Sequence, residues 1–248
     1  MLERLLGARG KAAARPTLPE HQTRTAWQAV SLLLGYPSDE LRDQLPLIRG
    51  AVAPLPAGVR DPLVRLIDHL ENSDAEQTRI AYVDTFDHTR RCALHLTYFV
   101  HGDTRKRGIA LVQFKQAYRR GGLEVTEDEL PDHLCVLLEF GALGDLDIAW
   151  KLLTSHRASV EVLRLALDDR HSPWADAMHA LVATLPALEG DQATAVARLI
   201  EQGPPNEDVG MDAYALDPRL NPHPEAEAES LVYLGMPQGS SATAGARS

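Results

Sequence analysis

The sequence from residue 82 to residue 140 reads YVDTFDHTRRCALHLTYFVHGDTRKRGIALVQFKQAYRRGGLEVTEDELPDHLCVLLEF. It contains seven of the 13 aromatic residues, four of the ten histidines and both cysteines of the chain. Its charge reverses part-way along: residues 87–120 carry eight Lys or Arg against two Asp, whereas residues 123–147 carry eight Asp or Glu and no Lys or Arg. A basic helical region that leads directly into an acidic one, with aromatic residues throughout, favours binding of another polypeptide over turnover of a small molecule.

Apolar residues recur at helical spacing on both sides of this stretch, which predicts an all-α fold. Trp27, Val30 and Leu34 share one helical face, for example, and Gly35 then ends that helix. Sustained alternation of apolar and polar residues and the Asn-Gly or Asp-Gly signals of hairpins are both missing from the sequence. We therefore expect a single-domain multi-helix bundle. The expected helices cover residues 27–34, 38–48, 61–70, 73–86, 92–100, 103–120, 131–140, 148–153, 160–167, 172–185 and 193–200.

Three of these expectations depend on particular residues. Asp61-Pro62 has the pattern of an N-cap followed by proline in the first helical turn. Ser73 and Glu76 have the spacing of a capping box, in which each side chain satisfies a free backbone donor of the other residue. Residues 92–100 are apolar almost all round, which predicts a central buried helix that ends at His101.

The composition divides the chain into three regions. Residues 1–22 are predicted to be a flexible basic tail, residues 23–203 the helical domain, and residues 204–248 a Pro-rich, acidic and mostly disordered tail. The N-terminal residues lack the continuous apolar stretch of a secretory signal, and no segment approaches the ~18–20 apolar residues of a membrane span. We expect a cytoplasmic protein that is not a stable membrane protein, with reduced Cys92 and Cys135.

Composition and spacing also weigh against two other functions. The formal net charge of −10 opposes nucleic acid as a partner, although the basic residues 105–120 leave a weak case for it. A helical metal- or cofactor-binding enzyme that uses His88, His95, His101 and His133 is the main alternative. The first three of these histidines are seven and six residues apart, rather than at the i, i+4 spacing typical of helical metal sites. We expect no catalytic residue, metal or cofactor.

Two short motifs are the candidate binding residues. Residues 129–133, Glu-Leu-Pro-Asp-His, place two carboxylates and an imidazole at a predicted helix start, where free backbone N–H groups favour negative charge. The same residues are also typical of a capped, acidic helix N-terminus that has only a structural role. Tyr82 and Phe86 lie four residues apart on one helical face, a spacing that is also typical of core residues.

The region from residue 25 to residue 210 resembles the nitrate reductase delta-subunit type of molybdenum-enzyme assembly chaperone. This group is similar to the wider redox-enzyme maturation chaperones, which recognise twin-arginine leader peptides. The resemblance rests on these segments: Ser31–Pro37, Thr85-Phe86-Asp87, Arg90-Arg91, Leu96–Phe99, His101–Arg105, Arg107-Gly108, Phe114-Lys115, Glu129–Leu134 and Gly203-Pro204-Pro205.

The resemblance implies an all-helical, non-enzymatic cytoplasmic chaperone. Such proteins bind the apo catalytic (alpha) subunit of respiratory nitrate reductase at its N-terminal segment, with the complex of alpha and beta subunits as a further candidate partner. They support insertion of the molybdenum cofactor before membrane attachment. The peptide-recognition motifs of the family correspond here to residues on either side of the charge reversal. The implied partner-binding residues are Tyr82, Phe86, Arg90, Arg91, Tyr98, Glu129, Asp132 and His133.

Overall fold

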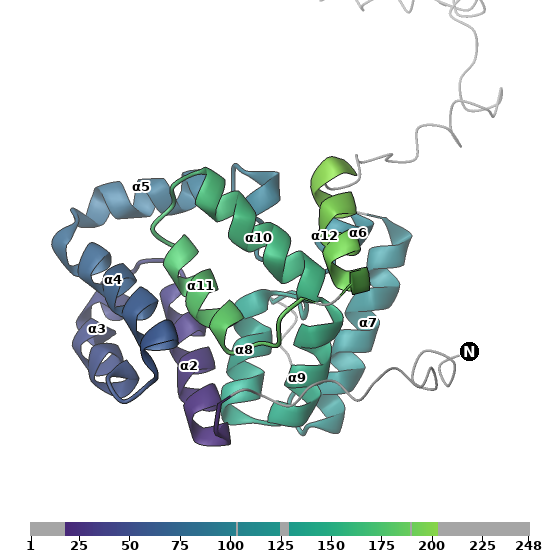
Figure 1. Ribbon diagram of the computed structural model, residues 1–248, viewed down its shortest axis with the longest axis horizontal. Coiled ribbons are helices and arrows are strands. Elements are labelled where there is room, and N and C mark those ends of the chain that lie inside the picture. Colours follow the sequence, from purple (N-terminus) through teal and green to yellow (C-terminus); the bar gives the residue numbers. More distant parts are fainter. Residues whose placement is uncertain (1–17, 103, 125–128, 189, 203–248) are drawn as a thin grey trace, which may run out of the picture. The chain divides into compact units, whose positions relative to one another are not determined.

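The computed structural model describes residues 18–102, 104–124, 129–188 and 190–202 (Figure 1). Within these ranges the chain is helical, and its one β pairing is an isolated bridge between His95 and His133. The all-α prediction is therefore confirmed. The helices are α2 (Glu20–Leu33), α3 (Asp39–Val52), α4 (Ala57–Asn72), α5 (Ala75–Phe86), the 3-10 helix η1 (Arg90–Cys92), α6 (Tyr98–His101), α7 (Arg105–Arg120), α8 (Leu134–Leu143), α9 (Leu146–Ser155), α10 (Arg157–Asp169), α11 (Ala175–Ala183) and α12 (Gly190–Gln202).

The predicted tails fall largely outside this description. Residues 1–17 and 203–248 are not among the described residues, and a second unit over residues 208–248 lies wholly beyond them. At the N-terminal boundary α2 begins at Glu20, and Thr23 is already fully buried, so the helical domain starts before residue 23. None of the helices in the described ranges has the length and hydropathy that a bilayer crossing requires.

Helix α2 is the centre of the bundle and packs most extensively against α8 (Figure 1). Its Trp27 is fully buried and stacks on Trp150 of α9, with ring centroids 5.9 Å apart. The indole N–H of Trp27 donates to Thr184 Oγ1 at 3.0 Å, which satisfies its polar group inside the core. A Cβ added to Gly141 of α8 would lie 2.6 Å from the Trp27 ring, so the crossing of α2 and α8 requires a glycine.

Several expected helix starts shift in the structure. Helix α4 begins at Ala57, one turn before Pro62, because Val59 is buried on the same face as Leu63 and extends the apolar surface. Burial of that extra turn outweighs the single backbone hydrogen bond that a proline inside a helix removes. At α5, Asp74 rather than Ser73 is the N-cap and accepts from the backbone N–H of Gln77 at 2.9 Å.

Other boundaries differ less. The predicted N-cap Ser38 of α3 is confirmed by its bond from the Leu41 N–H. The predicted cap at residue 103 lies outside the described residues, and Thr104 is the N-cap of α7. Helix α11 starts at Ala175, after rather than at the predicted Ser172 cap.

The predicted helix over residues 92–100 is wrong for residues 93–97. The 3-10 helix η1 precedes this non-helical stretch, here called the extended segment, in which His95 bridges to His133. Helix α6 then covers Tyr98–His101, so the predicted end of the helix at His101 is correct. The Leu96 N–H donates to the Asp132 carbonyl at 3.0 Å, and the Leu134 N–H donates to the Leu94 carbonyl at 2.8 Å. This pairing supplies backbone partners that would otherwise come from a helix. The expected burial is correct, since Leu94, Leu96 and Phe99 are all buried.

The close crossing of α2 and α8 yields a stability prediction. We expect Gly141→Ala to lower the free energy of unfolding by about 2 kcal/mol, because the new methyl group overlaps the Trp27 ring in a packed core. Gly108→Ala is the matched control: Gly108 is an exposed residue of α7 with open space around its Cα. It should gain about 0.5–1 kcal/mol through helix propensity. Urea denaturation measures both values, and equal effects of the two substitutions would contradict the packing argument.

Candidate functional site

The carboxylate of Asp132 is fully buried at the junction of three segments. It accepts hydrogen bonds from the backbone N–H of Thr97 at 3.2 Å and from the Thr97 hydroxyl. His95 Nδ1 lies 3.3 Å from Asp132 Oδ1, and the guanidinium of Arg107 approaches Oδ2 to 3.7 Å. Asp132 thus joins the extended segment, α7 and the residues before α8.

Two opposing effects set the pKa of Asp132. Burial favours the neutral acid, but the adjacent His95 imidazole, the hydrogen bonds from Thr97 and the charge of Arg107 outweigh it and lower the pKa to about 2. Asp132 is therefore ionised at neutral pH. Because its side chain is completely covered, Asp132 cannot contact a partner peptide directly, although the resemblance implied that it is a partner-binding residue.

His133 occupies the N-cap position of α8. Its Nδ1 accepts from the backbone N–H of Cys135 at 3.3 Å, and its ring lies 5.1 Å from the His95 ring. Burial and the proximity of His95 lower the pKa of His133 to about 4, so it is neutral at physiological pH and serves as a cap. The start of α8 thus lies three residues after Pro131, and the proline does not form its first turn.

The aromatic motif forms a second cluster. Tyr82 and Phe86 are buried, and both rings contact Trp174, at 5.4 and 5.5 Å between centroids. The Tyr82 hydroxyl donates to the Leu34 carbonyl at 2.9 Å, at the end of α2. Tyr36, in contrast, is 50% exposed while its ring packs edge-on against Tyr82 at 5.5 Å. Tyr36 is therefore the solvent-facing member of this cluster.

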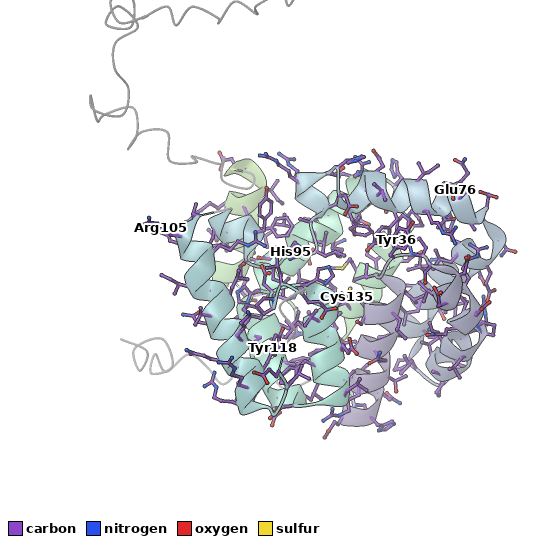
Figure 2. All side chains as sticks on the ribbon, turned by 180° about the vertical axis from the view of Figure 1, so that it is seen from behind. Tyr36, Glu76, His95, Arg105, Tyr118 and Cys135 are labelled. Atoms are coloured by element: carbon purple, nitrogen blue, oxygen red, sulfur yellow. The ribbon has the colours of Figure 1, made fainter. Side chains whose placement is uncertain are left out.

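The end of α2 connects the two clusters. Ser31 of α2 donates to the Cys135 carbonyl at 2.9 Å, in the first turn of α8 that His133 caps. Tyr82 bonds one turn further along, to Leu34. In the view of Figure 2, Cys135 lies between Tyr36 and His95. We call the face formed by Tyr36, His95, Glu129, His133 and Cys135 the motif face.

The remaining candidate residues are dispersed. Tyr98 is buried beneath Arg107, whose guanidinium carbon lies 5.6 Å from the ring centroid, so it supports the Asp132 cluster. Glu129 is exposed and lines a depression beside α8. Arg90 and Arg91 are exposed on η1, and Arg91 lines a separate, small hollow with residues of α10 and α12. The structure does not bring Arg91 to the residues of the acidic motif.

The four-histidine site of the alternative enzyme does not form. Of its members, His95 and His133 come together, whereas His88 is exposed and lies 3.9 Å from Asp84. Among the described residues no group of three or more His, Cys, Asp or Glu side chains is arranged to hold a metal ion. Burial raises the pKa of the Cys92 thiol and raises that of Cys135 to about 12, which makes both poor nucleophiles.

The sequence did not indicate several residues that take part in the candidate site. Tyr36 lay within a matching segment but carried no signal of its exposure. Thr97 and Arg107 likewise have no spacing relation to Asp132, because their contacts bridge 35 and 25 positions of the chain. Such contacts arise from the extended segment, which the helical pattern of residues 92–100 concealed.

Known proteins are similar in sequence to much of this chain. The family described as nitrate reductase delta subunit matches residues 53–180, from the end of α3 into α11. The chain belongs to this family. The match covers the extended segment, the Asp132 cluster, and Tyr82, Phe86 and Trp174 of the aromatic cluster, whereas Tyr36 precedes the matched residues. The family assignment indicates an assembly chaperone rather than an enzyme.

Individual relatives agree with the family match. The chain is 32% identical over 160 residues to the probable nitrate reductase molybdenum cofactor assembly chaperone NarJ of Bacillus subtilis. The aligned residues are 64% of this chain and 87% of that protein. It is 32% identical over 149 residues to the NarJ chaperone of Escherichia coli, covering 59% and 63%. The nitrate reductase-like protein NarX of Mycobacterium tuberculosis is 35% identical over 158 residues, which are 64% of this chain and 24% of NarX.

The Asp132 cluster predicts a large effect of a small substitution. Asp132→Asn should lower the free energy of unfolding by about 3 kcal/mol, because it removes the buried charge that Thr97, His95 and Arg107 surround. Glu129→Gln, an exposed carboxylate in the same motif, should change it by less than about 0.5 kcal/mol. Chemical denaturation at pH 7 compares them, and a loss below about 1 kcal/mol for Asp132→Asn would contradict the assigned role.

His133 predicts a pH dependence of stability. Its folded pKa of about 4 lies below the ordinary 6.5, so the unfolded chain takes up a proton first as the pH falls. Its contribution is complete above pH 6.5 and is lost as the pH falls from about 6.5 to about 4, with a slope of up to ~1.4 kcal/mol per pH unit.

His133→Asn keeps a capping side chain but removes this titration. Denaturation curves between pH 7 and pH 4 should show a shallower loss of stability for this variant than for the wild type. His88→Asn, at an exposed position, serves as the control and should follow the wild type. If His133→Asn and the wild type lose stability in parallel, His133 is not the buried neutral group described.

Proposed function

We propose that this protein is a cytoplasmic chaperone for the assembly of respiratory nitrate reductase. It binds the apo catalytic (alpha) subunit at that subunit's N-terminal segment and supports insertion of the molybdenum cofactor before the enzyme attaches to the membrane. The family match and the names of the NarJ relatives support the assembly role. The complex of alpha and beta subunits is a further proposed partner.

One observation carries the proposed binding site: two motifs 47 residues apart, Tyr82–Phe86 and Glu129–His133, converge on the junction of α2 and α8. Tyr82 bonds to Leu34, and Ser31 bonds to Cys135 beside the His133 cap. A peptide that binds the motif face would meet the exposed ring of Tyr36 and the exposed carboxylate of Glu129. That combination suits an amphipathic segment with both apolar and cationic side chains.

Individual residues then have distinct roles in this proposal. Tyr36 provides the apolar contact, with Tyr82 and Phe86 beneath it as support. Glu129 provides the charge that attracts a cation. Asp132 is a positioning residue, because its carboxylate is covered and holds Thr97 and His95 in place. Tyr98, also covered, acts through Arg107 in the same way.

The test is calorimetric titration of a synthetic peptide with the N-terminal sequence of the nitrate reductase alpha subunit. We expect Tyr36→Ala to weaken binding about tenfold at low and at high salt, since buried aromatic anchors supply much of the affinity of such interfaces. Glu129→Gln should weaken binding chiefly at low salt, because exposed charges act through screened attraction.

Ile109→Ala is the matched control, because Ile109 is a 64% exposed apolar residue of α7 that is not part of the motif face. It should bind like the wild type. Circular dichroism before titration verifies that each variant is folded. Wild-type affinity of both Tyr36→Ala and Glu129→Gln at every salt concentration would show that the peptide binds elsewhere.

A further inference from the structure

Three neighbouring depressions surround the C-terminal end of α8. A cavity of about 790 Å³ is lined by residues that include Leu18, Arg24 and Asp147. It shares Gly121 and Gly144 with a second cavity, of about 480 Å³, between the end of α7 and α8. A third, of about 350 Å³, lies between α2, α3 and α8, and shares Arg24 with the first and Leu143 with the second. We call these three depressions together the α8-end surface.

Within the α8-end surface, the lining of the second and third depressions is mainly apolar and open to solvent. Leu143 is 73% exposed and lies between the second and third depressions. Leu47 on one side is 75% exposed, and Leu123 on the other is 40% exposed. Large apolar side chains exposed together in a hollow mark a surface that another segment covers.

The rim of the same surface is acidic. Glu124, Glu129 and Glu139 line the second depression, and Glu20 and Asp147 line the first. Within the described part of the chain, Glu129, Glu139 and Asp147 form no ion pair with a basic side chain. An unpaired carboxylate group beside an apolar lining attracts a segment that is both cationic and apolar.

The cation of this surface, Arg24, is already engaged. Its Nη1 donates to the carbonyl oxygens of Gly141, Ala142 and Gly144 at 3.0–3.1 Å, and its Nε donates to Glu20 at 2.9 Å. Arg24 therefore neutralises the negative end of α8 and the carboxylate of Glu20. It leaves the charges of Glu129, Glu139 and Asp147 uncompensated.

We propose that residues 1–17 of this chain dock on the α8-end surface. This segment, MLERLLGARGKAAARPT, carries Arg4, Arg9, Lys11 and Arg15 against Glu3, and its leucines are at positions 2, 5 and 6. Its net charge of +3 and its leucines complement the acidic rim and the apolar lining. The described chain begins at Leu18, which itself lines the first depression, so the segment starts at the edge of its binding surface.

Tethering makes this docking favourable. A segment attached at the edge of its own site has an effective concentration in the millimolar range, so even weak contacts keep it bound. Because Glu129 belongs both to the α8-end surface and to the motif face, the docked segment competes with a cationic partner peptide for this carboxylate. The docked segment is thus a different occupant, on a larger surface, from the partner peptide of the proposed chaperone function.

The experiment is photo-cross-linking in the full-length chain, with p-benzoylphenylalanine in place of Leu5. Irradiation of an equal mixture of ¹⁴N- and ¹⁵N-labelled protein, followed by digestion and mass spectrometry, locates the cross-links and separates those within a chain from those between chains. We expect cross-links within one chain to residues of the α8-end surface, chiefly between positions 121 and 147. They should weaken as the salt concentration rises.

Charge-reversal variants provide the matched comparison. Glu139→Lys with Asp147→Lys should reduce the yield of these cross-links at least about threefold, since they reverse the attraction. Glu76→Lys, at an exposed position of α5, changes the net charge without altering this surface and should leave the yield unchanged (Figure 2).

Three results would overturn the proposal. Cross-links found only between differently labelled chains would assign the surface to a second copy. The absence of cross-links to this surface in the isolated protein would indicate that a segment of a partner protein covers the surface instead. An equal yield from the charge-reversed and wild-type chains would exclude the complementarity on which the docking rests. None of these results alters the calorimetric test of the motif face, which uses a partner peptide and the variants Tyr36→Ala and Ile109→Ala.

Discussion

A buried carboxylate that must stay charged is the constraint on which this structure depends. Asp132 holds the N–H and hydroxyl of Thr97, faces His95 and is approached by Arg107. A lone buried charge costs several kcal/mol, so these partners have to be present together. They come from three separate segments, and satisfying one side chain therefore fixes the extended segment, the position of α7 and the start of α8.

Helix α8 transmits that constraint to the rest of the domain. Its first turn is capped by His133 and bonded to Ser31 of α2, and its glycine at position 141 lets Trp27 pack directly on its backbone. Its last turn is closed by Arg24 of the same α2. The two exposed surfaces of interest are adjacent along the pair of helices α2 and α8. The motif face lies at the start of α8, the α8-end surface lies at its C-terminus, and Glu129 contributes to both.

Most helices could be predicted from the sequence because they depend on interactions between residues that are close in sequence. Apolar periodicity located α2, α3, α7, α8, α9, α10 and α12, and Ser38 was correctly recognised as a cap. The start of α4 was wrong because burial of Val59 overrode a proline signal. The helix over residues 92–100 was wrong for a related reason. A segment made almost entirely of apolar residues has no apolar periodicity, so its sequence predicts burial but not secondary structure. Its backbone hydrogen bonds can be made within a helix or, as here, to a segment that is distant in sequence.

The sequence by itself determined the all-α class, the family, and the two motifs from which the candidate site is built. Only the tertiary structure decided where each motif residue lies. Tyr82, Phe86 and Asp132 are buried, and Tyr36 is an exposed aromatic residue whose ring packs against Tyr82. Helical spacing reports which residues share a face of one helix, whereas exposure depends on what packs against that face. The exposure of the motif residues is set by Trp174, Leu34 and Thr97. These residues are remote from the motifs in sequence and contact them only in the folded bundle.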